Sequence, residues 1–139
     1  DYAHSPDAVV NVLAATREFT QGRVIAILGC GGDRDATKRP LMGSALAQGA
    51  DVAIFTSDNP RSEPPSEILK EMVAVVTVTE PSRIIEDRKA AIDYAISIAQ
   101  AGDTVILLGK GHESGQEING QKFAFDDRLV LAESIEAKR

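Results

Sequence analysis

Four consecutive residues near the middle of the chain combine a carboxylate, an amide and a guanidinium. Asp58, Asn59, Pro60 and Arg61 come shortly after the apolar segment 52–56. The arginine fork pairs two N–H groups with a carboxylate, and the aspartate attracts an ammonium group. Proline fixes one backbone angle, which lowers the entropy cost of holding its neighbours in place. The tetrapeptide is suited to recognising a zwitterion, although an Asx-Pro pair is equally typical of a structural turn.

A glycine-rich loop follows the apolar segment 23–28 and ends in a second arginine. Gly29 and Gly31 match the start of a dinucleotide-binding fingerprint, but Arg34 stands where the third glycine belongs. This mismatch disfavours a nicotinamide or flavin site. The glycines would instead let Arg34 approach a ligand closely; the alternative is a tight turn with a solvated arginine. We interpret Cys30 as a small loop or core residue, because nothing nearby supplies a general base for a nucleophile.

A third loop, residues 109–113, contains glycine, lysine, histidine and glutamate. It is not a nucleotide-phosphate loop, because Thr104 stands where the first glycine of that motif belongs and no Ser or Thr follows Lys110. Glu113 adds a second carboxylate to the candidate groups. His112 is either a hydrogen-bonded structural residue or a catalyst, and the sequence leaves both interpretations open.

These three loops follow three expected strands, so they should meet at one edge of a parallel sheet, where such sheets bind ligands. The crevice would then hold Arg34, Arg61, Asp58, Glu113 and Asn59. Two arginines suit a ligand with two carboxylates, and two carboxylates suit its ammonium groups. A diamino dicarboxylic acid satisfies this set one for one. A network of internal salt bridges is the alternative.

The elements that must position these loops are short apolar runs alternating with amphipathic segments. Strands are expected over 23–28, 52–56, 73–78 and 104–108, and Asn119-Gly120 predicts a tight hairpin near the C-terminus. Helices are expected from Pro6 to Phe19 with Ser5 as a hydroxyl cap, over 40–48 and 66–72, from a cap at Asp87 or a neighbour through Ala99, and from Asp126 through Ile135. This alternation predicts an α/β fold: an open, mostly parallel sheet with helices on both faces and right-handed crossovers.

Composition limits the classes of partner. The 139 residues suit one domain, and a net charge of -6 argues against a nucleic acid or an anionic membrane surface as partner. No apolar run approaches the roughly 20 residues that span a bilayer. One cysteine fits a reducing, cytoplasmic location, and two histidines leave little material for a metal site. The chain starts at Asp1 without a methionine, so we expect it to be part of a longer protein.

Five motifs in order resemble the carboxy-terminal domain of the Mur ligases, specifically the members that add diaminopimelate. The motifs are DYAHSPD at 1–7, GGDRD at 31–35, KRPLMG at 38–43, DNPR at 58–61 and GKGHE at 109–113. The resemblance covers essentially the whole chain. It implies a Rossmann-like fold, with residues 1–139 as the single C-terminal, amino-acid-binding domain of a three-domain ligase. The N-terminal domain and the central ATPase domain would be the chain's own partners.

The resemblance also implies a reaction in cytoplasmic peptidoglycan synthesis. ATP would phosphorylate the D-glutamate carboxylate of UDP-N-acetylmuramoyl-L-alanyl-D-glutamate, and the amine of meso-2,6-diaminopimelate would attack the acyl phosphate. ATP and Mg²⁺ are the implied cofactors, with phosphate and metal sites mainly in the central domain. This domain would bind the amino acid and close over ATP, contributing no catalytic residue and no metal ligand, so the isolated chain is expected to be inactive.

Individual roles carry over from the family motifs by position. The resemblance assigns Arg34 to a carboxylate at the reacting end of diaminopimelate and Arg61 to its distal carboxylate. It assigns diaminopimelate binding as well to Asp58, Asn59, Gly109 and Glu113, and ATP binding to Asp1 and His4. Lys38 and Arg39 receive no role. Lysine lacks the distal carboxylate, so a dry site that leaves Arg61 unpaired would reject it by a factor on the order of 10⁴.

Two other functions stay open at this point. Related ligases such as folylpolyglutamate and cyanophycin synthetases share an opening similar to DYAH, but the motif at 58–61 argues against them. A non-catalytic, Rossmann-like amino-acid-binding module is the alternative from a different class, and a source protein of about 139 residues would favour it.

Overall fold

Three apolar strands form most of a parallel sheet. The computed structural model describes residues 4–110 and 113–138. Strands β1 (Val24–Cys30) and β2 (Val52–Ser57) are buried along their whole length, which explains their continuous apolar sequences. β4 (Thr104–Leu108) pairs with the other side of β1, and the sheet order is β3-β2-β1-β4. In register, Ile25 lies opposite both Val52 and Val105.

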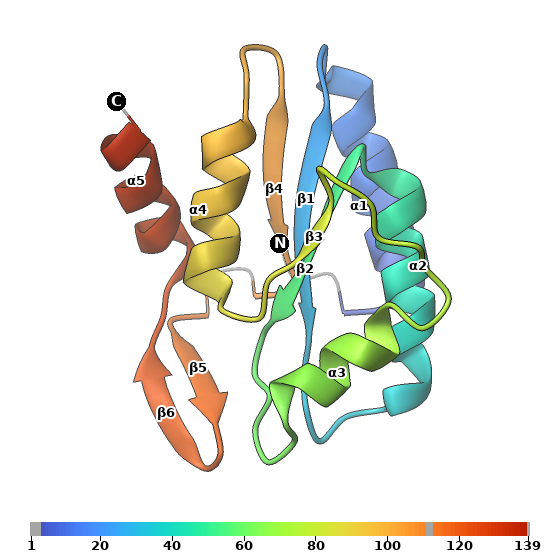
Figure 1. Ribbon diagram of the computed structural model, residues 1–139, viewed down its shortest axis with the longest axis vertical. Helices are drawn as coiled ribbons and strands as arrows, with labels where there is room; N and C mark the ends of the chain where they lie inside the picture. Colours follow the sequence, from blue (N-terminus) through green and yellow to red (C-terminus); the bar gives the residue numbers. More distant parts are fainter. Residues whose placement is uncertain (1–3, 111–112, 139) are drawn as a thin grey trace.

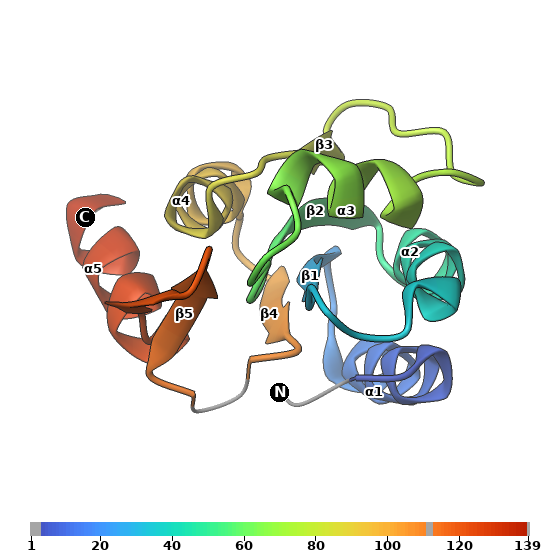
Figure 2. The same cartoon turned by 90° about the horizontal axis from the view of Figure 1, so that it is seen from below.

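Helices cover both faces of this sheet, as predicted. Figure 2 shows α1, α2 and α3 on one side of the sheet and α4 and α5 on the other, and Figure 1 shows the same layers from the front. The helices are α1 (Pro6–Phe19), α2 (Arg39–Gly49), α3 (Pro65–Met72), α4 (Arg88–Ile98) and α5 (Asp127–Lys138), and a short 3₁₀ turn, η1 (Ala36–Lys38), precedes α2.

The helix ends follow the signals in the sequence. Ser5 caps α1, because its hydroxyl accepts a hydrogen bond from the N–H of Ala8 and Pro6 occupies the first turn. Asp87 caps α4 in the same way, accepting from the N–H of Ala90. These caps fix where each helix starts, and therefore how long the loops before them are.

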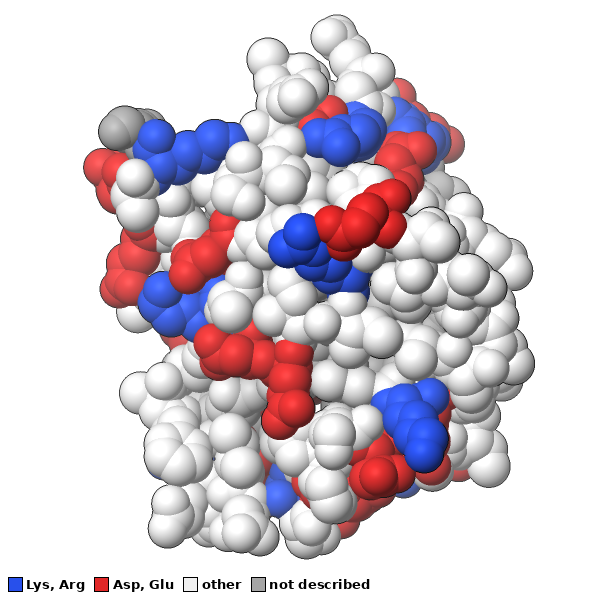
Figure 3. Space-filling view, in the orientation of Figure 1, with Lys and Arg blue, Asp and Glu red and all other residues white. Residues whose placement is uncertain are grey.

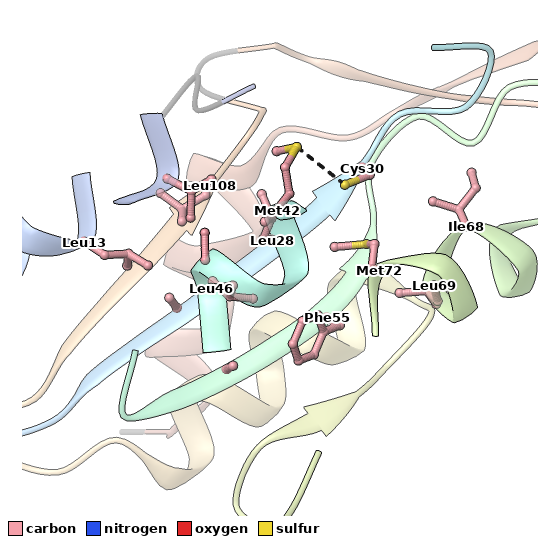
Figure 4. Close-up of a cluster of buried hydrophobic side chains, with 14 of the residues drawn as sticks. Leu13, Leu28, Cys30, Met42, Leu46, Phe55, Ile68, Leu69, Met72 and Leu108 are labelled. Carbon is pink, nitrogen blue, oxygen red and sulfur yellow. Dashed lines mark hydrogen bonds between the residues drawn. The ribbon is translucent and has the colours of Figure 1, made fainter. Parts of the chain in front are cut away.

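Two apolar clusters hold the layers together. Alternate residues of β1 point to opposite faces, so Leu28 joins the cluster under α1–α3 and Ile27 joins the cluster under α4 and α5. Figure 4 shows the first cluster, in which Leu46 of α2, Phe55 of β2 and Met72 of α3 gather beside the strands. These side chains are all fully buried: Ile27, Leu28, Leu46, Phe55 and Met72.

The strand expected over 73–78 is not formed. The edge strand is instead β3, only Arg83–Ile84, which pairs with Ile54 and Phe55 of β2. Val73, Val76 and Val78 pack half-buried against the first apolar cluster without joining the sheet. The β-branched residues of this segment reflect partial burial against the apolar cluster rather than strand pairing.

The hairpin predicted near the C-terminus is present. β5 (Gly115–Ile118) pairs with β6 (Gln121–Ala124) in antiparallel fashion, separate from the main sheet. Asn119 and Gly120 occupy the turn with φ of 54° and 81°, the left-handed values that an Asn-Gly turn requires. Among the described helices, none is long and apolar enough to cross a membrane.

Candidate functional site

The loops after β1, β2 and β4 surround a cavity of about 420 Å³. Six of the residues singled out from the sequence line it: His4, Arg34, Asp58, Asn59, Arg61 and Glu113. Gly109 is not among the lining residues; it has a φ of 98° and turns the chain toward Lys110. Asp1 and His112 lie outside the described residues. The structure therefore gathers most of the candidate groups at one edge of the sheet.

Arg61 is held firmly at the cavity by its main chain. Its φ of 53° lies in the left-handed region, which residues other than glycine rarely adopt. Its N–H donates to the Glu117 carbonyl at 2.9 Å, and its carbonyl accepts from the N–H of Asn119 at 2.6 Å. In the side chain, Nη1 donates to the Gly32 carbonyl at 2.9 Å, and Nε lies 3.6 Å from Glu117 Oε1.

The Arg61 guanidinium retains donors for a ligand. Within the part of the chain that the structure describes, Nη2 makes no hydrogen bond, and the side chain is 20% exposed. A guanidinium offers five N–H donors in one plane, so a carboxylate in the cavity can still pair with it.

Asp58 is buried and already paired with a cation. Lys110 Nζ lies 3.3 Å from Asp58 Oδ1, and both side chains are almost completely buried. The same ammonium lies 5.8 Å from the ring centre of Phe125, close enough for a cation–π interaction. Lys110 is a partner that the sequence argument missed. The available signal in the sequence was that Lys110 follows a strand and Gly109 directly, which places it at the same edge of the sheet as Asp58.

Asn59 joins two of the loops. Its side-chain Oδ1 accepts from the N–H of Glu117 at 2.8 Å, and its carbonyl accepts from the N–H of Gly32 at 2.7 Å. Gly32 is required at this point because a Cβ there would lie 1.8 Å from the Pro60 carbonyl oxygen. The backbone of the first loop therefore packs directly on the second.

Glu113 and Arg34 complete the charged lining. Glu113 Oε1 is buried and has no hydrogen-bond partner among the described residues. A buried acceptor without a partner costs free energy, so a ligand carrying an N–H donor would relieve this cost. Arg34 is exposed, and its Nη1 donates only to the neighbouring Asp33 carbonyl at 3.1 Å.

Arg39 supports the cavity from beneath. Its buried guanidinium donates to Glu63, to Glu71 and to the Gly31 carbonyl. Hydrogen bonds from this guanidinium, together with the N–H of Asp33, lower the pKa of Glu63 to about 2. These contacts tie the start of α2 to the loop after β2, a role that the sequence did not assign to Arg39.

Cys30 also lines the cavity, but its thiol is inert. It is 6% exposed and its sulfur contacts Met42 Sδ at 3.9 Å, as drawn in Figure 4. Burial raises the pKa of the Cys30 thiol to about 12, so the reactive thiolate is scarce at neutral pH. This environment agrees with its interpretation as a core residue.

Outside the cavity, charged side chains are mixed in sign. On the face shown in Figure 3, Lys and Arg lie beside Asp and Glu rather than forming one continuous patch. Exposed ion pairs such as Arg83 with Glu80 and Lys89 with Asp93 likewise bring opposite charges together on the surface.

Solved and curated proteins resemble this chain closely. Among the relatives named UDP-N-acetylmuramoyl-L-alanyl-D-glutamate--2,6-diaminopimelate ligase are the following three. The protein of Geobacillus thermodenitrificans (strain NG80-2) is 51% identical, over 100% of this chain and 29% of its own. The protein of Streptomyces coelicolor (strain ATCC BAA-471 / A3(2) / M145) is 54% identical, over 97% of this chain and 28% of its own. The protein of Chelativorans sp. (strain BNC1) is 56% identical, over 99% of this chain and 28% of its own.

A solved structure of a ligase with this name matches the fold. It has a TM-score of 0.92 and 45% sequence identity, and the match covers 99% of this chain and 28% of that one. This chain thus spans less than a third of the length of these relatives. Residues 1–111 match the family described as "Mur ligase, glutamate ligase domain". Since this match covers most of the sequence, the chain belongs to the Mur ligase family.

Proposed function

We propose that this chain is the amino-acid-binding domain of a ligase that adds meso-2,6-diaminopimelate to UDP-N-acetylmuramoyl-L-alanyl-D-glutamate in peptidoglycan synthesis. The observation that carries the proposal is the placement of Arg34, Arg61 and Glu113 around one cavity, each with unused hydrogen-bonding capacity toward a ligand. The names of the relatives support the same substrate.

The two arginines and Glu113 are opposite in charge to the groups of the ligand that each would bind. Arg61 would bind the distal carboxylate, because its Nη2 is not used by the described residues. Arg34 would bind the carboxylate at the reacting end, and Glu113 Oε1 would accept from the distal ammonium. Asp58 would add negative charge behind the ammonium, although its Oδ1 already meets Lys110. The main chain at Gly109 would shape the same end of the site.

The proposed reaction requires an amine that is held in position for attack. The γ-phosphoryl group of ATP passes to an oxygen of the D-glutamate carboxylate, which gives an acyl phosphate and ADP. The amine nitrogen of diaminopimelate then attacks the carbonyl carbon, the C–O bond to phosphate breaks, and the amine loses a proton. Binding both ends of the amino acid in this cavity would orient the attacking nitrogen and lower the entropy cost of the encounter.

ATP and Mg²⁺ would bind mainly to other parts of the longer protein. When bound, ATP supplies the phosphoryl group and Mg²⁺ offsets phosphate charge. His4, at the cavity rim, is the described residue proposed to contact ATP, together with Asp1, which lies outside the described residues. Within residues 4–110 and 113–138 no group of three or more His, Cys, Asp or Glu side chains is placed to hold a metal ion.

The wider setting is part of the same proposal. Since the relatives are more than three times longer than this chain, we propose that N-terminal and central domains of one polypeptide are its direct partners. A cytoplasmic location follows from substrates of this kind. A folylpolyglutamate- or cyanophycin-type ligase and a non-catalytic amino-acid-binding module are the competing functions.

The proposal is tested on the full-length protein that contains this chain. ADP release would be measured with UDP-N-acetylmuramoyl-L-alanyl-D-glutamate and ATP, adding either meso-diaminopimelate or lysine at equal concentration. Release that depends on diaminopimelate, and that is far weaker with lysine, supports the function. Equal release with lysine contradicts the proposed specificity, and release that needs no amino acid contradicts the reaction.

The same assay on the 139-residue chain alone separates the domain from the enzyme. No ADP release is expected, because this chain is proposed to bind the amino acid rather than to transfer phosphate. Turnover by the isolated chain would show that the catalytic groups lie within these residues and would overturn the division of roles.

A further inference from the structure

A buried glutamine in the hairpin contacts the segment that carries the cavity's charged residues. Gln116 of β5 is 8% exposed, although the hairpin as a whole lies outside the main sheet. Its amide Nε2 donates to Ser57 Oγ at 3.0 Å and to the Asp58 carbonyl at 2.7 Å. Both N–H groups of this amide are therefore directed at the end of β2.

The neighbouring residues of the hairpin extend this contact through the main chain. The N–H of Glu117 donates to Asn59 Oδ1, and its carbonyl accepts from the N–H of Arg61. One residue further, Arg61 and Ile118 form an isolated parallel bridge. The segment 57–61 is thus bonded as if it were a further strand beside β5, and Figure 1 shows the hairpin lying beside the lower end of β2.

This arrangement determines how Arg61 meets the cavity. Its left-handed φ is unfavourable for a residue with a side chain and persists only where surrounding contacts hold it. On the β5 side, these contacts use main-chain groups except for the Gln116 amide and the Glu117 carboxylate; on the other side, Asn59 uses its side-chain Oδ1. The Gln116 amide is the buried one of the two, so it is the side chain most able to keep β5 in register with the segment.

We propose that Gln116 is a positioning residue for ligand recognition, which acts by fixing the segment 57–61 against the hairpin. It does not touch the ligand; it sets the position of the main chain from which Asn59 and Arg61 project. The consequence for diaminopimelate binding rests on the proposed function, whereas the consequence for the segment itself does not.

The test compares two substitutions of equal size in the same hairpin. Gln116→Met keeps the length of the side chain and removes both donors, and Gln121→Met makes the same change at an exposed position of β6. In the full-length protein, we expect Gln116→Met to raise KM for diaminopimelate roughly 5- to 20-fold, because the loss of two internal hydrogen bonds lowers the fraction of molecules in which segment 57–61 is positioned for binding. We expect kcat and KM for ATP to change less than about twofold. Gln121→Met should behave like the unaltered protein.

A milder variant covers the case in which Gln116→Met does not fold. Gln116→Asn retains the amide but shortens its reach by one methylene, so KM for diaminopimelate should rise in the same direction. An unchanged KM in either folded variant, when the unaltered protein does use diaminopimelate, overturns the inference. A KM for ATP that rises equally also overturns it, because that result indicates general damage.

Amide hydrogen exchange tests the positioning without any substrate. Exchange at the N–H groups of Gly32 and Arg61, which bond to Asn59 and Glu117, should be at least about tenfold faster in Gln116→Met than in Gln121→Met. Exchange within β1 should not change. Unchanged exchange at these two groups, or equal acceleration in β1, contradicts the inference. The exchange measurement tests the inference even if the unaltered protein does not use diaminopimelate. That failure would refute the proposed function but not the positioning role of Gln116.

Discussion

At the scale of single residues, the charged groups around the cavity fall into two classes. Asp58 pairs with Lys110 inside the protein, and the buried Arg39 pairs with Glu63 and Glu71, although its Nε has no hydrogen-bond partner among the described residues. Arg61 and Glu113 keep atoms that no described residue uses. Counting charges in the sequence placed Asp58 and Glu113 in one class, because sequence shows the type of a side chain but not its partner. The structure thus narrows the groups expected to contact a ligand directly.

Replacing Arg61 should weaken binding of the amino acid and leave binding of ATP nearly unchanged. Hydrogen bonds to charged groups contribute about 1.5–3 kcal/mol, so Arg61→Ala in the full-length protein should raise KM for meso-diaminopimelate roughly 10- to 100-fold. KM for ATP should stay within about twofold. The measurement is amino-acid-dependent ADP release.

Arg83→Ala is the matched control, since Arg83 is an exposed arginine on the edge strand β3, bonded to Glu80. It should leave both KM values unchanged. Unaltered use of diaminopimelate by Arg61→Ala would remove Arg61 from the binding site.

At the scale of elements, local signals predicted most of the fold. The caps at Ser5 and Asp87 and the turn at Asn119-Gly120 act over a few residues, and each was found where the sequence placed it. The segment 73–78 was misread because β-branched residues favour strands and burial alike. The contact of Gln116 with Ser57 could not be predicted, because it joins polar residues 59 positions apart that show no periodic pattern.

The packing of one loop on another gives a prediction at this scale. In Gly32→Ala, the new Cβ would lie 1.8 Å from the Pro60 carbonyl oxygen, a distance that requires the backbone of one loop to move. We expect a loss of about 1–3 kcal/mol in the free energy of unfolding, measured by urea denaturation, as for other overpacked sites. Diaminopimelate binding should weaken as well, since Arg61 Nη1 bonds to the carbonyl of Gly32.

Gly115→Ala is the control for this change. A Cβ at position 115 would meet the Phe123 carbonyl oxygen at 3.6 Å, an ordinary contact, and the residue lies in a strand of the same hairpin that supports the site. Equal stability of the two variants would show that the two loops can separate without cost.

At the scale of the whole molecule, two carboxylates with lowered pKa values bind distant parts of the chain together. Glu63 joins the loop after β2 to Arg39 at the start of α2 and to Asp33 after β1. Asp103, before β4, accepts from the N–H groups of Arg23 and Gln100 at the opposite end of the sheet, and these bonds lower its pKa to about 2. Both ends of the sheet therefore depend on an ionised carboxylate.

The stability of the molecule should consequently decline in acid. The pKa of Glu63 falls from 4.5 to about 2 on folding, so between these values the unfolded chain binds more protons than the folded one. Its stabilising contribution is complete above about pH 4.5 and is lost as the pH falls toward 2. In Glu63→Gln this contribution is absent at every pH. The free energy of unfolding should therefore be lower than that of the unaltered chain at pH 7, with a smaller difference at pH 3.

Urea denaturation at pH 7 and pH 3 measures this convergence, with Glu67→Gln as the control. Glu67 is an exposed glutamate in the first turn of α3, close in sequence to Glu63, and no described residue forms an ion pair with it. Its variant should follow the pH dependence of the unaltered chain. If Glu63→Gln does so too, the bonds from Arg39 and Asp33 to Glu63 contribute nothing to stability, and the acid sensitivity must come from Asp103 or from other carboxylates.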